Sequence, residues 1–293
     1  MRASVTGRLA SAMLMVLALA AALAVSPSPP ASAQPRERNQ VVLGFYQDVD
    51  TFNVLTLSTD AGSIAIRAFM DPLVEGDPKW KYQPILVSEI PSLVNKMWRV
   101  LPNGRMELTW KLRPNVRWHD GKPFTSADVL FTHQLATDSR IPVTYSLCGN
   151  APHIESVQAP DPLTVVVTYR RVYAFAYQCV VEGSRWGAVP RHIFEPVYQR
   201  NPAGIKEMAL GKDARLTIGN GPFRFRHWLR GNEIFFEANA DYWRGRPKTG
   251  RLFFRYFADV NTLLTNLVAG AVDVVGPAPS GIFFGQGLQL EEL

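Results

Sequence analysis

The chain has 293 residues and a formal net charge of +6 at pH 7, from 31 basic and 25 acidic residues. Hydrophobic residues make up 47% and charged residues 19% of the chain, which excludes an intrinsically disordered protein and provides enough apolar material for about two domains. The positive excess is mild and dispersed. A basic cluster over 244–255 is interleaved with aromatic residues, and we interpret it as a solvated strand and turn, so no nucleic-acid partner is expected.

The first 33 residues have the three parts of a secretory signal peptide in order. Arg2 and Arg8 precede an apolar run over 9–25, and the small-x-small pattern Ala31-Ser32-Ala33 follows it. The run is shorter than the roughly 20 residues of a membrane span, which disfavours an N-terminal anchor. We therefore expect a signal peptide over 1–33, no lipid-modified cysteine, and a periplasmic or secreted protein that does not itself span the membrane. Its mature charge would be 31 − 2 basic minus 25 acidic residues, or +4.

Two cysteines, Cys148 and Cys179, bracket a segment that is expected to form a hairpin. An oxidising compartment favours their pairing, and a bond would close a loop of about 30 residues. Spacing does not decide bond geometry, so bonded and free cysteines both stay open at this point.

Strands and helices are both predicted along the first half of the mature chain. In order, the pattern predicts a strand over 41–46, a polar loop over 47–51, a helix over 61–70, a turn over 75–78, a strand over 106–112 after the turn 102–104, and strands over 154–157 and 163–169. The first helix should end where Asp71 precedes Pro72. Thr125 and Asp128 have the spacing of a capping box, which predicts a further helix from that point.

The second half continues the mixed pattern. It predicts strands over 223–228, 233–237 and 252–257, a helix over 260–269, and a short buried strand over 272–275. Apolar residues at i, i+3, i+4, i+7 and i+8 give that helix one apolar face, and Gly270 is a natural C-terminal cap. The whole chain is therefore expected to be α/β or α+β, without internal repeats.

Common catalytic patterns do not occur in the sequence. There is no His-Glu-x-x-His, no Gly-x-Ser-x-Gly and no Walker loop, and the five histidines never stand four residues apart. Gly219-Asn220-Gly221 precedes Pro222 and a strand, so it cannot present a helix N-terminus to a phosphate. His119 and Asp120 are expected to shape a turn. We expect no catalytic residues, no metal and no cofactor, with a secreted hydrolase kept as the less favoured alternative.

Two motifs resemble a known family. The stretch WKLRPNVRWHDGKPFTSADV over 110–129 is similar to the strand–turn–helix signature of the family 5 solute-binding proteins of ABC importers, also known as the peptide/nickel/oligopeptide-binding family. A second stretch, with IGNGPF at 218–223, RGN at 230–232 and NADYWRGRPK at 239–248, resembles another signature of this family, as does 259–273. Asn220 stands where the family usually has Thr, and Ala240 stands where it usually has Pro. Both are structural positions, so these departures do not change the resemblance.

This resemblance implies a periplasmic binding protein-like α/β fold of type II, with mixed sheets, in which two lobes close on a solute and an extra lobe lies beside the first. It implies a first lobe over 34–75 plus 186–272, an extra lobe over 76–185, and the start of an incomplete further lobe over 273–293. Relatives are longer, so the second closing lobe is expected to be largely missing from a C-terminally truncated chain.

The implied function is capture of a peptide or similar small solute and its delivery to the permease subunits of an ABC importer, by a protein that is expected to be a monomer. Tyr46, Gln47 and Asp48, after the first strand, and Arg185 and Trp186, where the chain re-enters the first lobe, are the expected ligand contacts; core or hinge packing is the alternative for Tyr46 and Trp186. A truncated or degenerate binding protein with a sensing or partner-dependent role is the other alternative. A peptide, a nickel chelate, haem and an oligosaccharide stay open as ligands.

Overall fold

The computed structural model describes residues 39–79, 81–143 and 148–276. The expected signal peptide over 1–33 lies outside the described residues, as does most of the segment over 273–293. Helices and three separate sheets occur among the described residues, which confirms the mixed α/β class predicted from the sequence.

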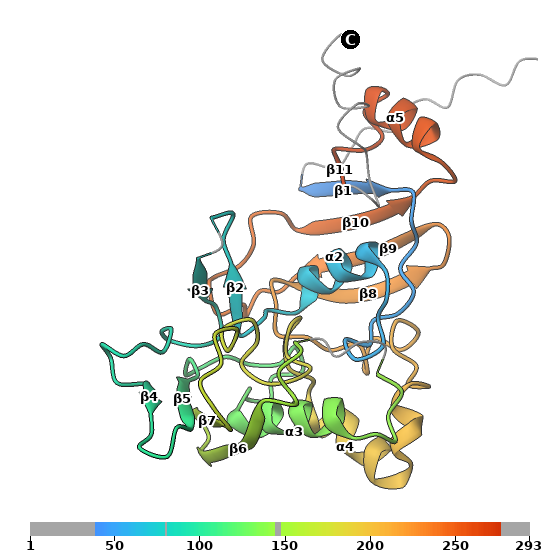
Figure 1. Ribbon diagram of the computed structural model, residues 1–293. Coiled ribbons are helices and arrows are strands. Elements are labelled where there is room, and N and C mark those ends of the chain that lie inside the picture. The colour runs from blue at the N-terminus through green and yellow to red at the C-terminus, as the bar shows by residue number, and fades with distance from the viewer. Residues whose placement is uncertain (1–38, 80, 144–147, 277–293) are drawn as a thin grey trace, which may run out of the picture. The chain divides into compact units, whose positions relative to one another are not determined.

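The first sheet has five strands in the order β11-β1-β10-β9-β8 (Figure 1). Strand β1 is parallel to both β10 and β11, whereas β9 is antiparallel to both β10 and β8. The beginning and the end of the described chain therefore lie side by side in one sheet. The strands are β1 (Gln40–Phe45), β8 (Phe223–Leu229), β9 (Glu233–Ala238), β10 (Arg251–Tyr256) and β11 (Val274–Val275).

Helix α2 (Asp60–Phe69) belongs to the core of this sheet. It begins where the Thr59 side chain accepts a hydrogen bond from the Gly62 N–H, and it ends at the residues before Pro72, as predicted. The face of α2 that carries small and apolar side chains is buried in this core. The opposite face keeps a stripe at i, i+3, i+4 and i+7 that is exposed or half-buried, namely Asp60, Ser63, Ile64 and Arg67.

Helix α5 (Val260–Val268) packs against the sheet through a smaller cluster of Val42, Leu263 and Val272. Gly44 of β1 makes this packing possible, because a β-carbon there would lie 2.3 Å from Leu263 Cδ1. The Asp259 side chain caps the helix by accepting the N–H groups of Asn261 and Thr262, and Gly270 follows its end with a φ of +70°.

The second sheet is antiparallel, in the order β4-β5-β7-β6, and forms a second core. Alternation along β5 buries Met106, Leu108 and Trp110, as the period of two predicted. A separate hairpin joins β2 to β3. The strands are β2 (Val74–Gly76), β3 (Tyr82–Pro84), β4 (Trp98–Val100), β5 (Met106–Lys111), β6 (Ile154–Asp161) and β7 (Thr164–Tyr169).

Helix α3 (Ser126–Thr137) contributes to both cores. Its capping box is formed, with the Asp128 carboxylate accepting the Thr125 N–H at 2.9 Å. Val129 belongs to the core of the four-stranded sheet, whereas Phe131 and Leu135 belong to the core of the five-stranded sheet. A helix with apolar contacts on two sides ties the two cores together.

Some elements differ from the sequence prediction. The turn expected over 75–78 is wrong in position, because Glu75 and Gly76 end strand β2 and the turn begins at Pro78. The strand expected over 272–275 is shorter in the structure, where β11 contains only Val274 and Val275. Strands of two or three residues carry no readable alternation. Helix α4 (Arg191–Arg200), followed by the 3-10 helix η2 (Pro202–Ile205), was not predicted because Pro196 interrupts its pattern.

The end of α2 lies against the loop that begins at Ile218. The Gly221 N–H donates to the Phe69 carbonyl at 2.9 Å, and the Asp71 N–H donates to Asn220 Oδ1 at 3.0 Å. A β-carbon on Gly219 would lie 1.8 Å from the Phe69 carbonyl oxygen. Glycine is therefore required at this position by close approach of two backbones.

We predict that Gly219→Ala lowers the free energy of unfolding by roughly 3 kcal/mol or more, because the backbone of α2 must move to admit the methyl group. Gly76→Ala is the matched control, since a β-carbon there meets nothing within 4 Å. Urea unfolding followed by circular dichroism measures both variants. Equal unfolding midpoints for the two variants would contradict the close approach.

Candidate functional site

The parallel strands define one edge of the five-stranded sheet. Strands β11, β1 and β10 all end at this edge, where the chain continues into Gly276, Tyr46 and Phe257 respectively. In open α/β sheets, ligands bind outside the carboxyl ends of parallel strands. This edge, together with the adjoining loop and the exposed stripe of α2, is the candidate site.

The three residues after β1 are held by contacts within the chain. Tyr46 is half-buried and packs against the small cluster under α5. Gln47 Oε1 accepts the Ala61 N–H at 3.2 Å, in the first turn of α2. Asp48 accepts its neighbour's N–H and, at 2.9 Å, the N–H of Gly231 in the β8–β9 turn. These contacts shape the edge, and Tyr46 combines packing against the cluster with a partly exposed surface.

Arg185 and Trp186 form a partly exposed stack with a residue that the sequence interpretation missed. The Arg185 guanidinium lies 5.0 Å from the centroid of the half-buried Trp186 ring, and that of Arg67 lies 5.4 Å from it. Arg67 also pairs with Glu75, and Arg185 has no carboxylate partner among the described residues. Arg67 lies in the last turn of α2, on its exposed stripe. That position was the only feature of the sequence that could have indicated its presence at the site.

Helix α2 connects the two groups of expected site residues. Gln47 touches its first turn at Ala61, and Trp186 touches its last turn at Arg67. These two contact points are six positions apart, which corresponds to about 9 Å along the helix axis. The structure thus brings one residue of each group to the same helix, although no direct contact joins Tyr46, Gln47 or Asp48 to Arg185 or Trp186 in the described chain.

A disulfide and a buried carboxylate fix the segment that leads to Arg185. Cys148 and Cys179 are bonded, with 5.7 Å between their Cα atoms. Glu182 is buried, and its carboxylate accepts the N–H groups of Cys148, Asn150 and Ala151 at 2.9 to 3.1 Å. A buried carboxylate needs such donors, so the disulfide and Glu182 together order the chain on both sides of the bond.

The family-like motifs meet at a junction between the two sheets. His119 donates its backbone N–H to the Gly219 carbonyl, and its ring bonds twice to the same loop. Nδ1 accepts the Gly219 N–H at 3.2 Å, so the ring proton lies on Nε2, which is 3.1 Å from the Gly221 carbonyl. Burial lowers the pKa of His119 to about 4, and the neutral ring satisfies both backbone groups.

Asp71 is the second centre of this junction, and the sequence predicted only its place at the end of a helix. Its Oδ2 accepts hydrogen bonds from Tyr242 Oη at 2.9 Å and Trp243 Nε1 at 2.8 Å. Burial raises the pKa of the Asp71 carboxyl, against the lowering effect of these donors. The guanidiniums of Arg113 and Arg244 lie 5.0 Å and 4.5 Å, respectively, from the centroid of the Trp243 ring. An acidic residue inside the apolar run before Pro72 was the signal that the sequence offered.

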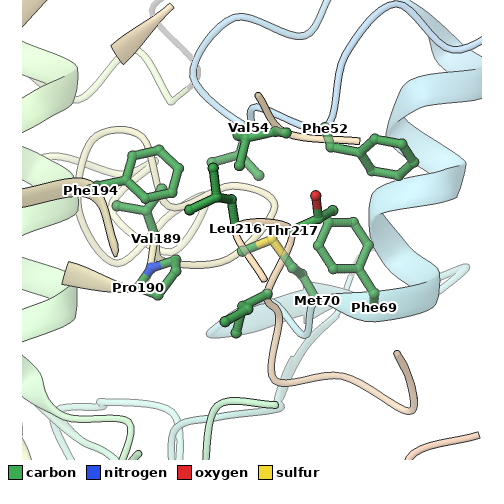
Figure 2. Close-up of a pocket in the computed structure, with 11 residues that line it drawn as sticks. Phe52, Val54, Phe69, Met70, Val189, Pro190, Phe194, Leu216 and Thr217 are labelled. Atoms are coloured by element: carbon green, nitrogen blue, oxygen red, sulfur yellow. The ribbon is translucent and has the colours of Figure 1, made fainter. Parts of the chain in front are cut away.

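One small apolar space lies in the first core, and it does not serve as a solute site. Its volume is about 10 Å³, roughly that of one water-sized sphere. Figure 2 shows Phe52 and Phe69 on one side of this space and Val189, Pro190 and Phe194 on the other. A peptide-sized solute needs hundreds of cubic ångströms, so this space is a packing gap.

Among the described residues, no group of three or more His, Cys, Asp or Glu side chains is placed to hold a metal ion. The described part of the chain also contains no helix that is long and apolar enough to cross a bilayer.

The fold of the described chain matches part of the fold of solved oligopeptide-binding proteins. The solved structure of the oligopeptide-binding protein of Thermus thermophilus, complexed with a pentapeptide, matches with a TM-score of 0.69 and 22% identity over 85% of this chain and 46% of that one. AppA of Bacillus subtilis, in complex with a nonapeptide, matches with a TM-score of 0.66 and 24% identity over 82% of this chain and 44% of that one.

The family model of the bacterial extracellular solute-binding proteins, family 5 Middle, matches residues 89–288. The chain therefore belongs to the family 5 extracellular solute-binding proteins, a family of binding proteins rather than enzymes, and the resemblance seen in the sequence is confirmed. A putative ABC transporter peptide-binding protein of Brucella ovis is 28% identical over 75% of this chain, and AppA is 25% identical over 83%. The chain spans only 38% and 41% of the length of these two relatives.

The disulfide generates one prediction. A bond between residues 31 apart should contribute about 3–4 kcal/mol to stability in the chain-entropy model. Replacing both cysteines by serine should therefore lower the midpoint of urea unfolding, and dithiothreitol should lower the wild-type midpoint to the same value. A wild-type midpoint that does not respond to dithiothreitol, with two thiols titrating in the unfolded protein, would contradict the bond.

A second prediction concerns pH. Because folding lowers the pKa of His119 from 6.5 to about 4, its contribution is fully present above pH 6.5 and is lost as the pH falls from 6.5 towards 4. The loss should be at most about 3 kcal/mol, since His119 keeps part of its surface exposed. Burial raises the pKa of Asp71 and Asp128, which acts in the opposite direction.

The effect of His119 is therefore isolated by comparing the wild type with His119→Gln. The glutamine amide does not titrate, and it can bond to either the Gly219 N–H or the Gly221 carbonyl. The difference in unfolding free energy between these proteins, measured in urea from pH 4 to pH 7.5, should change by about one to three kcal/mol in the direction that favours the wild type at high pH. A pH-independent difference would show that His119 does not titrate in this window.

Proposed function

We propose that the chain contributes one wall of the solute site in the extracytoplasmic substrate-binding component of an ABC importer. In this proposal the signal peptide is cleaved after residue 33, and the mature protein captures a peptide or similar small solute and delivers it to permease subunits. The solute stabilises the closed arrangement of lobes by binding it more tightly than the open one. The proposed lobes are 34–75 plus 186–272 for the first and 76–185 for the extra one.

One observation carries this proposal. A chain of the solute-binding family places a stack of Arg67, Trp186 and Arg185 on the exposed flank of α2, the helix that begins at the carboxyl edge of the parallel strands. A half-exposed aromatic ring with guanidiniums on it supplies apolar contact area and hydrogen-bond donors at low conformational cost. Relatives of this family include proteins named as peptide-binding, and a solved neighbour holds a nonapeptide.

The proposed wall has two parts with different roles. Arg185 and Trp186 offer their side chains to the solute. Tyr46, Gln47 and Asp48 form the adjoining edge, and the bonds of Gln47 and Asp48 to the first turn of α2 and to the β8–β9 turn hold that edge in place. The points at which the two parts contact α2 lie about 9 Å apart along the helix axis. In this proposal an extended solute bound at the Trp186 stack reaches from there towards the start of α2 and the edge after β1.

The direct test is native mass spectrometry of the protein isolated from the envelope fraction of its own host. A bound small molecule that is lost on denaturation, together with binding of a pool of random-sequence pentapeptides, is the expected result. A protein that carries nothing and binds none of these peptides, nickel–histidine or haem would overturn the solute-binding proposal in favour of a sensing or partner-dependent role.

Substitution separates the two parts of the wall. Trp186→Ala should weaken binding of the identified solute about tenfold, because the exposed part of the ring contributes contact area. Asp48→Asn should lower the unfolding midpoint, because it weakens the hydrogen bond to Gly231, and should change affinity little. Isothermal titration and urea unfolding measure the two effects. Unchanged affinity in Trp186→Ala would remove the stack from the site.

A further inference from the structure

Two loops of the four-stranded sheet carry large apolar side chains that are exposed to solvent. Leu93 and Val94 lie in the loop before β4, an edge strand of this sheet (Figure 1), and are 69% and 93% exposed. Val172 and Phe175 lie in the loop after β7 and are 55% and 66% exposed. We refer to these four residues as the apolar tip. Single exposed apolar residues are ordinary, but a group of them on adjoining loops indicates a contact surface.

A direct contact joins the two loops. Tyr177 Oη donates a hydrogen bond to the Pro91 carbonyl, and the Tyr177 ring packs edge-on against Trp98 with 5.1 Å between the ring centroids. Leu93 is two positions after Pro91, and Phe175 is two positions before Tyr177. The exposed residues of both loops therefore lie near one junction, where a single partner can cover them.

The loop before β4 is closed by its own hydrogen bonds. Asn95 Oδ1 accepts the N–H groups of Ser92 and Met97 at 2.8 and 3.1 Å, and Ser92 Oγ accepts the Asn95 N–H at 3.1 Å. Such bonds between a short polar side chain and the nearby backbone fix the shape of a turn. Leu93 and Val94 stay outside this turn, so a partner meets an apolar surface that is already formed.

The charge of the two loops is positive. Lys96 lies in the first loop, and Arg170 and Arg171 lie at the start of the second. All three are exposed, and none of them forms an ion pair with another residue that the structure describes. Glu89 is the one acidic residue in the ranges 88–97 and 170–178, and it accepts a hydrogen bond from Asn95 Nδ2 at 2.9 Å. Three cations against one acid therefore surround the apolar tip with positive charge.

We propose that the apolar tip inserts into the surface of an anionic lipid bilayer. Its four side chains enter the boundary between headgroups and acyl chains, while Lys96, Arg170 and Arg171 stay at the level of the lipid phosphates. Trp98 and Tyr173 lie in or next to the same loops and are half-buried. Their rings have an apolar body and a polar end, which suits this boundary. The contact is peripheral and does not depend on the proposed solute site.

The size and charge of this surface favour a bilayer over a second copy of the chain. A stable protein interface buries roughly 800 Å² on each partner, and four partly exposed side chains provide well under that area. A symmetric pair would also bring the same three cations of each copy to one contact, where like charges repel. An anionic bilayer takes up the apolar side chains and is attracted by the cations.

The test is co-sedimentation of the mature chain, residues 34–293, with vesicles of equal parts phosphatidylglycerol and phosphatidylcholine. Binding should weaken as the salt concentration rises, and it should be about tenfold weaker on phosphatidylcholine alone. The double variant Leu93→Ser/Val94→Ser and the single variant Phe175→Ser should each weaken binding by about fivefold or more. Leu229→Ser is the matched control, because Leu229 is 55% exposed but lies in β8 of the other sheet, and it should bind like the wild type.

Charge variants test the cationic part of the contact. Arg170→Gln combined with Arg171→Gln should weaken vesicle binding about fivefold and reduce its salt dependence, whereas Arg246→Gln, at an exposed arginine outside the two loops, should change neither. Midpoints of urea unfolding check that each variant folds. Absence of vesicle binding, equal binding to the two kinds of vesicle, or an equal loss in Leu229→Ser would overturn the proposal. Dimerisation in analytical ultracentrifugation that the Leu93→Ser/Val94→Ser variant abolishes would also overturn it, because a second copy would then be the partner.

Discussion

The structure depends on one close contact between two backbones. The last residues of α2 lie against the loop that begins at Ile218, close enough that a β-carbon on Gly219 or Gly221 would overlap Phe69. Asn220 receives the Asp71 N–H at the same place. Bulkier residues would separate the helix from the loop. The same loop is held from the other side by the His119 ring, which bonds to Gly219 and Gly221. The two sheets therefore share this contact.

Buried polar groups make this contact specific. Asp71 is stabilised by two donors from Tyr242 and Trp243, and His119 satisfies an N–H and a carbonyl of the loop with one neutral ring. Leaving any of these buried groups unpaired would cost about 1–3 kcal/mol, whereas each satisfied bond contributes less. The motifs that identify the family thus act mainly in joining the sheets, and the residues proposed to meet a solute lie outside them, at Arg185 and Trp186.

Sequence alone predicted the long elements and their class. Alternation along β5, the capping box of α3 and the Asp71–Pro72 boundary of α2 are local signals, and each of them was confirmed by the structure. The three-residue strands β2 to β4 and the proline-containing α4 were missed because their stability comes from partners distant in sequence.

The candidate site was predictable only in part, for the same reason. The carboxyl edge after β1 could be placed by its position after a buried strand. The actual partners of Gln47 and Asp48, in α2 and the β8–β9 turn, are tertiary contacts that no local pattern encodes. Arg67 and Glu182 were missed because one stacks on a ring distant in the sequence and the other is buried by the folding of the disulfide loop.

The most direct test of the account is a crystal structure of the protein with the solute it carries from its host. The account predicts that the solute contacts Trp186 and Arg185 on the flank of α2 and reaches the edge after β1, with His119, Asp71 and Gly219 out of contact with it. A solute bound to the His119–Asp71 junction, with the α2 flank empty, would contradict the assignment of the signature to structure and of the flank to binding.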